Sequence, residues 1–228
     1  MKIVFPLLLL GLFARADAQD CRADRIRMVK SQIEARGVRH PATLDAMRKV
    51  ERHLFVPPSY RKYAYDDTAL PIGYDQTVSQ PYIVALMTEL VRPGAGDKIL
   101  EIGTGSGYQA AVLAEIAGSV FTIEIVEELG IRTKALLKQL GYENIYPIIG
   151  DGYRGLPEKA PFDAILVTAA AESIPPALIS QLKEGGRMVV PVGSPGTVQD
   201  LKLVEKRKGR IVTTSIADVR FVPFTRKQ

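Results

Sequence analysis

Three alternating glycines, Gly103, Gly105 and Gly107, separate a short apolar stretch from a stretch that favours helix. Residues 98–102 have the composition of a buried strand, and residues 108–116 contain three alanines and have a good helix composition. Because glycine readily adopts a positive φ, this spacing predicts a tight turn between a strand and a helix. Such a unit forms a cradle for a nucleotide-like ligand, with free backbone N–H groups expected to point out of the turn.

The glycine spacing distinguishes two classes of ligand. The dinucleotide fingerprint has glycines at its first, third and sixth places, whereas here the sixth place is Tyr108 and the fifth is Gly107. This departure weakens a nicotinamide or flavin interpretation, and the loop resembles the E/D-x-G-x-G-x-G loop of class I methyltransferases, which bind S-adenosylmethionine. Glu124 ends the next predicted strand, 120–125, at 124 − 103 = 21 residues past Gly103. At that spacing its carboxylate can hold both ribose hydroxyls; a solvated strand end is the alternative interpretation.

Strands and helices alternate along the rest of the chain. Strands are predicted at 145–149, 162–168 and 186–192, helices at 127–140 and 174–182, and a hairpin at 200–206 and 211–219 around Gly209. This order predicts one α/β domain with a doubly wound, mostly parallel, Rossmann-like sheet of about seven strands and an antiparallel C-terminal edge. Asp151 and Gly152 follow the strand at 145–149, at the sheet edge where ligands of such folds bind.

The part of the chain before the glycine turn is predicted to be helical. Apolar positions predict a helix over 22–36 that stops at Gly37, and a second helix that Pro41 opens and Pro57-Pro58 ends. A polar loop, 75–81, then leads into an apolar helix at 82–91, and capping of this helix is the alternative to a functional role for Ser79. We therefore expect one domain over 22–228, with N-terminal helices and this loop in 22–92 and the Rossmann-like core in 97–228.

Composition and charge limit the chemistry. The 228 residues are 46% hydrophobic and carry a net charge of +5, so nucleic acid has to be considered as a partner. The basic residues are spread through 22–30, 202–210 and 226–227 without interleaved aromatics, which favours a solvated surface and no nucleic-acid partner. His40 and His53 are isolated and Cys21 is the only cysteine. No metal site, histidine base or thiol nucleophile is therefore expected in the core.

Residues 1–18 differ in kind from the rest. Lys2 precedes an apolar run at 3–13, and Ala16-Asp17-Ala18 offers a small-x-small cleavage site. This segment resembles a secretory signal peptide, and its apolar run is too short to span a membrane. The residues before Cys21 are a poor lipidation signal. The sequence predicts cleavage, with a mature chain that starts at Gln19 and has no stable membrane association.

Four stretches resemble the bacterial protein-L-isoaspartate (D-aspartate) O-methyltransferases, which repair aged proteins. Residues 76–82 resemble the family's substrate loop, 100–109 its cofactor loop, 161–170 its fourth strand and 219–224 its C-terminal signature. They occur in the family's order over about residues 25 to 225, and the first and last are specific to this family. Residues 1–18 are a departure, since most members begin near Arg25 and are cytosolic. Location therefore stays open between the cytoplasm and the periplasm or another exported site.

The resemblance implies transfer of a methyl group from S-adenosylmethionine to the free α-carboxylate of L-isoaspartyl residues in damaged proteins and peptides. The ester then closes to a succinimide, and hydrolysis restores some aspartate. It implies a catalytic role for Ser79, no metal and a monomer. Substrate contacts fall on Val78, Gln80 and Val222. The residues implied in cofactor binding are Thr77, Glu101, Gly103, Thr104, Gly105, Gly107, Glu124, Asp151 and Gly152.

The available side chains suit this reaction. An α-carboxyl group has a pKa of about 3.5, so it is ionised and nucleophilic at neutral pH and needs no general base. A nucleic-acid or small-molecule methyltransferase is the alternative. However, the fourth strand ends in Thr168-Ala169-Ala170-Ala171 instead of the Asn/Asp-Pro-Pro-Tyr/Phe motif of base methylases. A non-catalytic binding protein is expected to have lost Gly103, Glu124 or Ser79, and all three are present.

Overall fold

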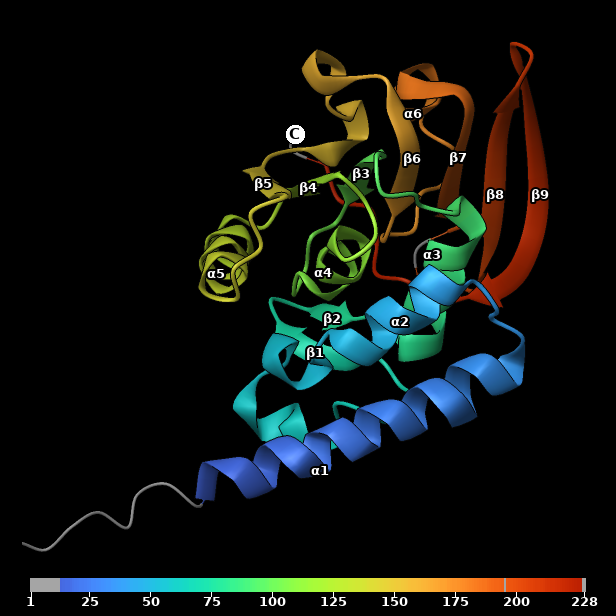
Figure 1. Cartoon of the computed structure of the whole chain (residues 1–228). Helices are drawn as coiled ribbons and strands as arrows, with labels where there is room; N and C mark the ends of the chain where they lie inside the picture. The colour runs from blue at the N-terminus through green and yellow to red at the C-terminus, as the bar shows by residue number, and fades with distance from the viewer. Residues whose placement is uncertain (1–12, 195, 227–228) are drawn as a thin grey trace, which may run out of the picture.

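The computed structural model of the protein describes residues 13–194 and 196–226, with side chains from residue 21 onward (Figure 1). The predicted signal peptide at 1–18 lies mostly outside the described residues. Of that segment only the backbone of residues 13–18 is described, as part of helix α1, Phe13–Met28. The structure therefore does not test cleavage before Gln19.

A seven-stranded sheet forms the centre of the molecule, in the order β5-β4-β3-β6-β7-β8-β9. Neighbours from β5 to β7 are parallel, whereas β7–β8 and β8–β9 are antiparallel. The predicted Rossmann-like sheet with an antiparallel C-terminal edge is confirmed. The strands are β3 Lys98–Ile102, β4 Ser119–Glu124, β5 Ile145–Ile149, β6 Phe162–Val167, β7 Leu182–Val192, β8 Gln199–Arg207 and β9 Arg210–Val219.

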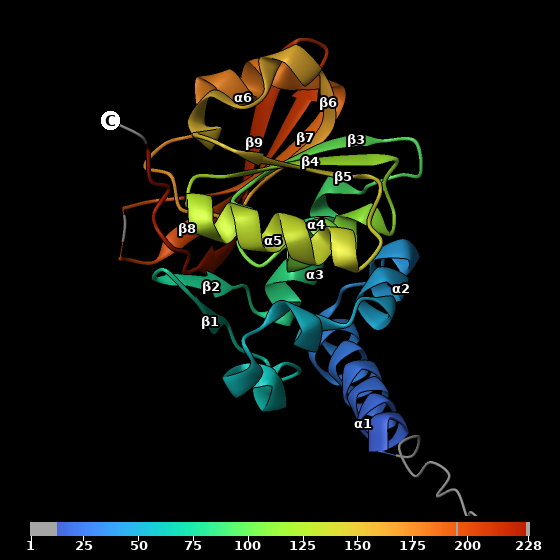
Figure 2. The ribbon, with the colours of Figure 1, turned by 90° about the vertical axis from the view of Figure 1, so that its left-hand side faces the viewer.

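Helices cover both faces of the sheet, as Figure 2 shows, with α3, α4 and α5 on one side and α6 on the other. Their bounds are α3 Pro81–Val91, α4 Tyr108–Ala114, α5 Glu127–Gln139 and α6 Pro176–Gln181. Successive residues of β3 alternate between two apolar clusters: Ile99 packs in the larger one and Leu100 in the smaller. Burial on both faces explains why the central strands are almost continuously apolar.

The N-terminal helices pack outside this layer. From α1 the helical stretch continues through a π-helical turn, Val29–Ile33, and a 3-10 turn, Glu34–Arg36. It ends at Gly37, which has a φ of 98°, and this confirms the predicted stop. Helix α2, Pro41–Lys49, begins at the predicted proline and packs against α3 and α4. The prediction that Pro57-Pro58 end it was wrong. Val50 is already extended, and a separate 3-10 turn, Arg52–Phe55, follows with Arg52 buried.

The polar loop predicted at 75–81 contains a strand that the sequence did not reveal. Strand β2, Gln76–Val78, pairs antiparallel with β1, Leu70–Gly73, in a small separate sheet. The turn between them places Tyr74 and Asp75 at φ 56° and 54°, a conformation that hairpin turns require and that sequence analysis expects of glycine or asparagine. The hairpin leads directly to Ser79 and α3.

Two element boundaries also differ from prediction. Strand β7 begins at Leu182 instead of residue 186, and α6 is shorter than the predicted helix at 174–182. Helix α6 begins only at Pro176, because proline lacks the backbone N–H that a residue in the interior of a helix donates. It ends before Leu182, which is extended because it already pairs with Phe162 of β6.

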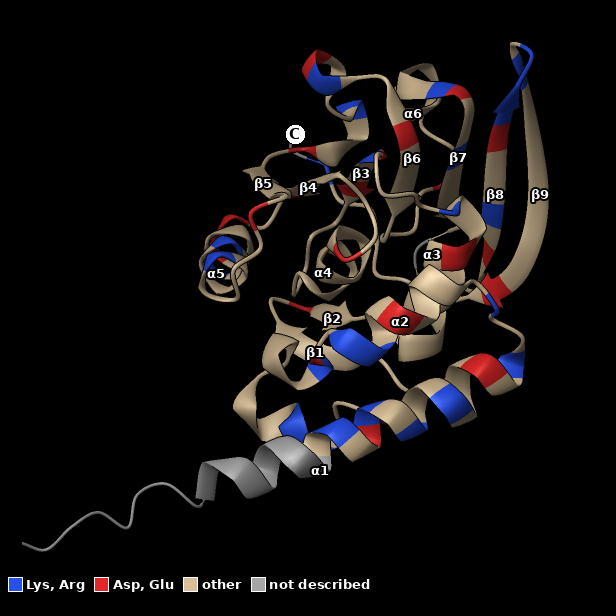
Figure 3. Ribbon diagram, viewed as in Figure 1, with Lys and Arg blue, Asp and Glu red and all other residues tan. Residues whose placement is uncertain are grey.

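Basic side chains are spread over α1, α2, α5 and β8, with acidic ones between them (Figure 3).

Candidate active site

The glycine turn joins β3 to α4, and all three glycines have positive φ: 98° at Gly103, 52° at Gly105 and 87° at Gly107. At Gly103 a Cβ atom would lie 2.4 Å from Thr168 Oγ1. That hydroxyl donates a bifurcated hydrogen bond to the carbonyl oxygens of Ile102 and Gly103, at 3.0 and 2.7 Å. The predicted tight turn is confirmed, and its first position has room only for glycine.

Most backbone N–H groups of the turn are not free, contrary to expectation. Five of them donate to acceptors within the protein, and the bonds of Gly103 and Thr104 continue the pairing of β3 with β4 into the turn. The donors are Gly103 and Thr104 to Ile123 O, Gly105 to the Glu124 carboxylate, Gly107 to Thr104 O, and Tyr108 to Ser106 Oγ. The turn therefore supplies a close-fitting wall and is not a ready-made phosphate cradle.

Glu124 ends β4 and is only 5% exposed, so the interpretation as a solvated strand end is excluded. One carboxylate oxygen accepts from the Gly105 N–H at 2.7 Å and the other from the Val126 N–H at 3.0 Å. Both are charge-assisted hydrogen bonds. They hold the carboxylate at the wall of a cavity formed by the carboxyl ends of the strands.

Glu101 is fully buried and its side chain does not line that cavity. One carboxylate oxygen accepts from the Thr122 hydroxyl, whose oxygen lies 2.7 Å from that of Thr104, and Thr104 does line the cavity. The other carboxylate oxygen has no hydrogen-bond partner among the described residues. Burial raises the pKa of Glu101 to about 8, and the nearby Glu124 carboxylate acts in the same direction.

The cavity opens to solvent at the carboxyl ends of the parallel strands, where ligands of such folds bind. It brings together most of the residues predicted for the site; Gln80, Glu101, Gly107 and Asp151 are not in its wall. The Asp151 carboxylate instead accepts from the Tyr153 N–H at 2.9 Å and caps a short 3-10 turn. The predicted residues that line the cavity are Thr77, Val78, Ser79, Gly103, Thr104, Gly105, Glu124, Gly152 and Val222.

A second groove adjoins this cavity. Thr77, Ser79, Thr168 and Val222 line both spaces, so the two meet at the end of β2. Gln80, the remaining predicted substrate contact, lies in the groove. Ser79 is not a helix cap, since Gln80 holds the cap position of α3 and no side chain makes a capping hydrogen bond.

Thr168 and Phe224 are among the residues of the cavity wall that sequence reasoning did not assign to the site. Thr168 ends the predicted strand at 162–168, so its place at a carboxyl strand end was a usable signal. Phe224 lies in the C-terminal segment that also brings Val222 to the cavity, and the resemblance of 219–224 to the family's C-terminal signature was the usable signal there. Two backbone hydrogen bonds fix the segment: Ala170 N–H to Val222 O at 2.8 Å and Phe224 N–H to Ala170 O at 2.9 Å.

The comparisons with known proteins agree with this geometry. The model of the family described as protein-L-isoaspartate(D-aspartate) O-methyltransferase (PCMT) matches residues 23–228. The chain belongs to this family. A protein-L-isoaspartate O-methyltransferase of Opitutus terrae is 54% identical over 228 residues, which cover 100% of this chain and 98% of that protein. Protein-L-isoaspartate O-methyltransferase 1 of Nitrosospira multiformis is 55% identical over 95% of this chain and 93% of its own.

Solved structures add the fold. A protein-L-isoaspartate O-methyltransferase structure is 32% identical with a TM-score of 0.80, covering 89% of this chain and 65% of that longer one. A putative enzyme of this kind from Plasmodium falciparum, crystallised with S-adenosyl-L-homocysteine, is 24% identical with a TM-score of 0.76 over 89% of this chain and 99% of its own. The protein is thus an S-adenosylmethionine-dependent carboxyl methyltransferase that repairs isoaspartyl proteins, and the nucleic-acid and small-molecule alternatives are not favoured.

The cavity fits S-adenosylmethionine on its own chemistry. Glu124 is the only charged residue in the described wall, and a carboxylate suits a cofactor that carries a sulfonium cation. A dinucleotide would need donors for its pyrophosphate, and five of the turn's N–H groups are already bonded within the protein. Among the described residues no group of three or more His, Cys, Asp or Glu side chains could hold a metal ion. No helix in the same residues has the length and apolarity to cross a membrane.

Proposed function

We propose that methyl transfer to the isoaspartyl carboxylate takes place where the cavity meets the groove, beside Ser79. Four residues belong to both spaces, and Ser79 is one of two among them that carry a hydroxyl within the substrate loop, 76–82. The cofactor supplies an electrophilic methyl group on a good leaving group. The Ser79 hydroxyl orients the carboxylate by donating a hydrogen bond to one of its oxygens, and no residue has to remove a proton.

The cofactor is held by the residues around the glycine turn. Gly103, Thr104 and Gly105 form the wall, and the Glu124 carboxylate accepts from the ribose hydroxyls. Thr77 and Gly152 close the cavity from the substrate loop and from the end of β5. Gly107 acts indirectly, since its lack of a Cβ lets α4 approach Thr133 of α5. Glu101 and Asp151 also act indirectly, by orienting Thr104 through Thr122 and by shaping the turn at Gly152.

The groove takes the peptide, with Val78, Gln80 and Val222 as its contacts. Intrinsic reactivity does not select the isoaspartyl form, because isoaspartyl and aspartyl carboxylates are both ionised at neutral pH. Selection is therefore geometric. The isoaspartyl linkage adds one methylene to the backbone and moves the free carboxylate one bond closer to it. A groove that holds the backbone can then bring only this carboxylate to Ser79.

A matched peptide pair tests this assignment. We expect methylation of an isoaspartyl peptide and essentially none of its aspartyl twin. A misplacement of about 1 Å costs around a hundredfold in rate, so Ser79→Ala should lower kcat strongly while cofactor affinity stays within a few-fold. Ser180→Ala, at an exposed serine on α6, is the control. Comparable turnover of the two peptides, or full activity of Ser79→Ala, would contradict the proposed site.

Export and a monomeric state complete the proposal. The apolar run and the Ala16-Asp17-Ala18 site support removal of residues 1–18, which leaves residues 22–228 as the working methyltransferase domain. Supply of a cytosolic cofactor argues against export. N-terminal sequencing of protein purified from its native host decides between them: a start at Gln19 supports export, and an intact Met1 refutes it.

Sedimentation of the purified protein at micromolar concentration tests for a monomer.

A further inference from the structure

Arg52 is the largest fully buried side chain of the protein's described part, and the mechanism above does not use it. It opens the 3-10 turn Arg52–Phe55 and points inward. Its guanidinium donates three hydrogen bonds to backbone carbonyls: Nε to Ala64 O at 2.8 Å, Nη1 to Ser79 O at 2.8 Å and Nη2 to Thr68 O at 3.2 Å. None of the ion pairs between described residues includes it.

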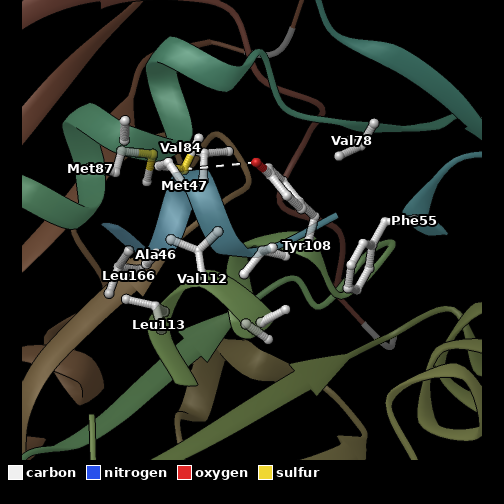
Figure 4. Close-up of a cluster of buried hydrophobic side chains, with 14 of the residues drawn as sticks. Ala46, Met47, Phe55, Val78, Val84, Met87, Tyr108, Val112, Leu113 and Leu166 are labelled. Carbon is white, nitrogen blue, oxygen red and sulfur yellow. Dashed lines mark hydrogen bonds between the residues drawn. The ribbon is translucent and has the colours of Figure 1, made fainter. Parts of the chain in front are cut away.

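A buried positive charge without a carboxylate partner is costly, and a neutral side chain of similar volume would fill the same space more cheaply. Burial lowers the pKa of Arg52 to about 10, so it still carries its charge at neutral pH. Its surroundings are aromatic: Cζ lies 5.0 Å from the centre of the Tyr108 ring, which in turn packs against Phe55 (Figure 4). The carbonyls and the ring face offset part of the cost but do not neutralise the charge.

The hydrogen bonds of Arg52 lead to the groove. Thr68 and Ser79 both line it, and they belong to segments on either side of the β1–β2 hairpin. A guanidinium presents its donors in a rigid planar fork, so one side chain fixes both carbonyls relative to each other. A lysine ammonium at the same position has neither the shape nor the donor spacing to replace this bridge.

The charge of Arg52 also suits what the groove receives. Of the charged residues in the groove wall, Asp67 and Asp218 repel a carboxylate and Arg220 attracts it. Asp67 is paired with Arg36 at 3.0 Å. Arg52 differs from these because it is shielded from water behind Ser79 and Thr68, where its field is weakly screened.

We propose that Arg52 is a positioning residue for methyl transfer: it fixes Ser79 and Thr68 in the groove wall and supplies the buried positive charge that draws the substrate carboxylate to Ser79. The proposal rests on the assignment of Ser79 to the transfer site.

Three variants separate its two roles. Arg52→Met removes both fork and charge, Arg52→Gln keeps a donor without the charge, and Arg52→Lys keeps the charge without the fork. For Arg52→Met we expect kcat/KM on an isoaspartyl peptide to fall at least about a hundredfold. The dissociation constant of S-adenosylmethionine should stay within about threefold, since Arg52 does not line its cavity. Arg61→Met, at an exposed arginine nearby in the chain, is the matched control.

The role of the Arg52 charge is measured with a second peptide, in which a neutral carboxamide replaces the free carboxyl group of the isoaspartyl residue. Wild-type protein and Arg52→Lys should bind the carboxylate peptide at least about tenfold more tightly than the carboxamide, and Arg52→Gln and Arg52→Met should lose this preference. A purely structural role would weaken both peptides equally and leave the preference unchanged. If Arg52→Met does not fold, the Arg52→Gln and Arg52→Lys pair carries the same comparison.

Two results would overturn the proposal. One is a carboxylate preference that is the same in wild type, Arg52→Lys and Arg52→Gln; the other is kcat/KM within about threefold of wild type in folded Arg52→Gln or Arg52→Met. Failure of the Ser79 assignment gives a different result, because Ser79→Ala would then be fully active. The carboxylate preference of the Arg52 variants is a separate measurement and does not depend on the activity of Ser79→Ala.

Discussion

Glu101→Gln should change how the stability of this protein depends on pH. The Glu101 carboxyl group is fully buried, and among the described residues only the Thr122 hydroxyl bonds to it. Burial raises its pKa from an ordinary value of 4.5 to about 8. A raised folded-state pKa means that the protonated form stabilises the fold. This stabilisation is fully present below the unfolded pKa and is lost as the pH rises through the folded one.

The size of the effect follows from the shift. The difference is about 8 − 4.5 = 3.5 pKa units, and each unit corresponds to about 1.36 kcal/mol. The upper limit is therefore about 5 kcal/mol of stability lost between pH 4.5 and pH values above 8. Glutamine stays neutral, so Glu101→Gln should gain on wild type as the pH rises, with little difference near pH 5.

Urea unfolding of the cofactor-free protein at pH 5, 7 and 9 measures this directly. The quantity of interest is the difference in unfolding free energy between wild type and Glu101→Gln, because all other titrating groups cancel in it. Glu143→Gln, at an exposed glutamate with no ion pair in the described part of the chain, should give a flat difference. Parallel pH profiles for wild type and Glu101→Gln would show that the buried carboxyl is not protonated in the folded protein.

Two further predictions concern the cofactor cavity. Glu124→Ala should weaken S-adenosylmethionine binding about ten- to a hundredfold, since it removes charge-assisted hydrogen bonds of roughly 1.5–3 kcal/mol. An unchanged dissociation constant in calorimetric titration would contradict the assignment of Glu124 to the cofactor site. Gly103→Ala should cost about 1–3 kcal/mol of stability, because its φ is 98° and the new methyl group would lie 2.4 Å from Thr168 Oγ1. Thermal unfolding measures this cost, and an unchanged melting temperature would mean that Thr168 moves aside freely.

The sequence predicts the core of this fold well because the signals there are long and redundant. The order of strands and helices from Lys98 to Val219 follows from apolar runs separated by glycine turns. Glu124 could be placed because the spacing from Gly103 is fixed by one helix and one strand. The β1–β2 hairpin escaped prediction for the opposite reason. Its second strand has three residues, too few for a periodic pattern, and its turn uses Tyr74 and Asp75 at positive φ.

The direction in which side chains point was the second feature that could not be predicted from the sequence. A sequence shows that an arginine or glutamate is present but does not show where it points, and charged residues are usually exposed. Arg52 and Glu101 are both fully buried, so this expectation fails for each. The prediction that the N–H groups of the glycine turn are free failed for a related reason. The acceptors of three of them, Ile123 O and the Glu124 carboxylate, lie on another strand, and only the folded sheet brings these acceptors within reach.

The proposed site needs neither an acid nor a base, because the substrate carboxylate is already ionised at neutral pH. In this proposal the Glu124 carboxylate lines the space assigned to the cationic cofactor, and Arg52 lies behind the wall of the groove assigned to the anionic substrate. Because the substrate is already ionised, what remains for catalysis is alignment, which can contribute on the order of 7–11 kcal/mol. A site of this kind needs rigid walls more than reactive side chains, which is why its supports, Gly103 against Thr168 and Arg52 against Ser79, are hydrogen-bonded contacts.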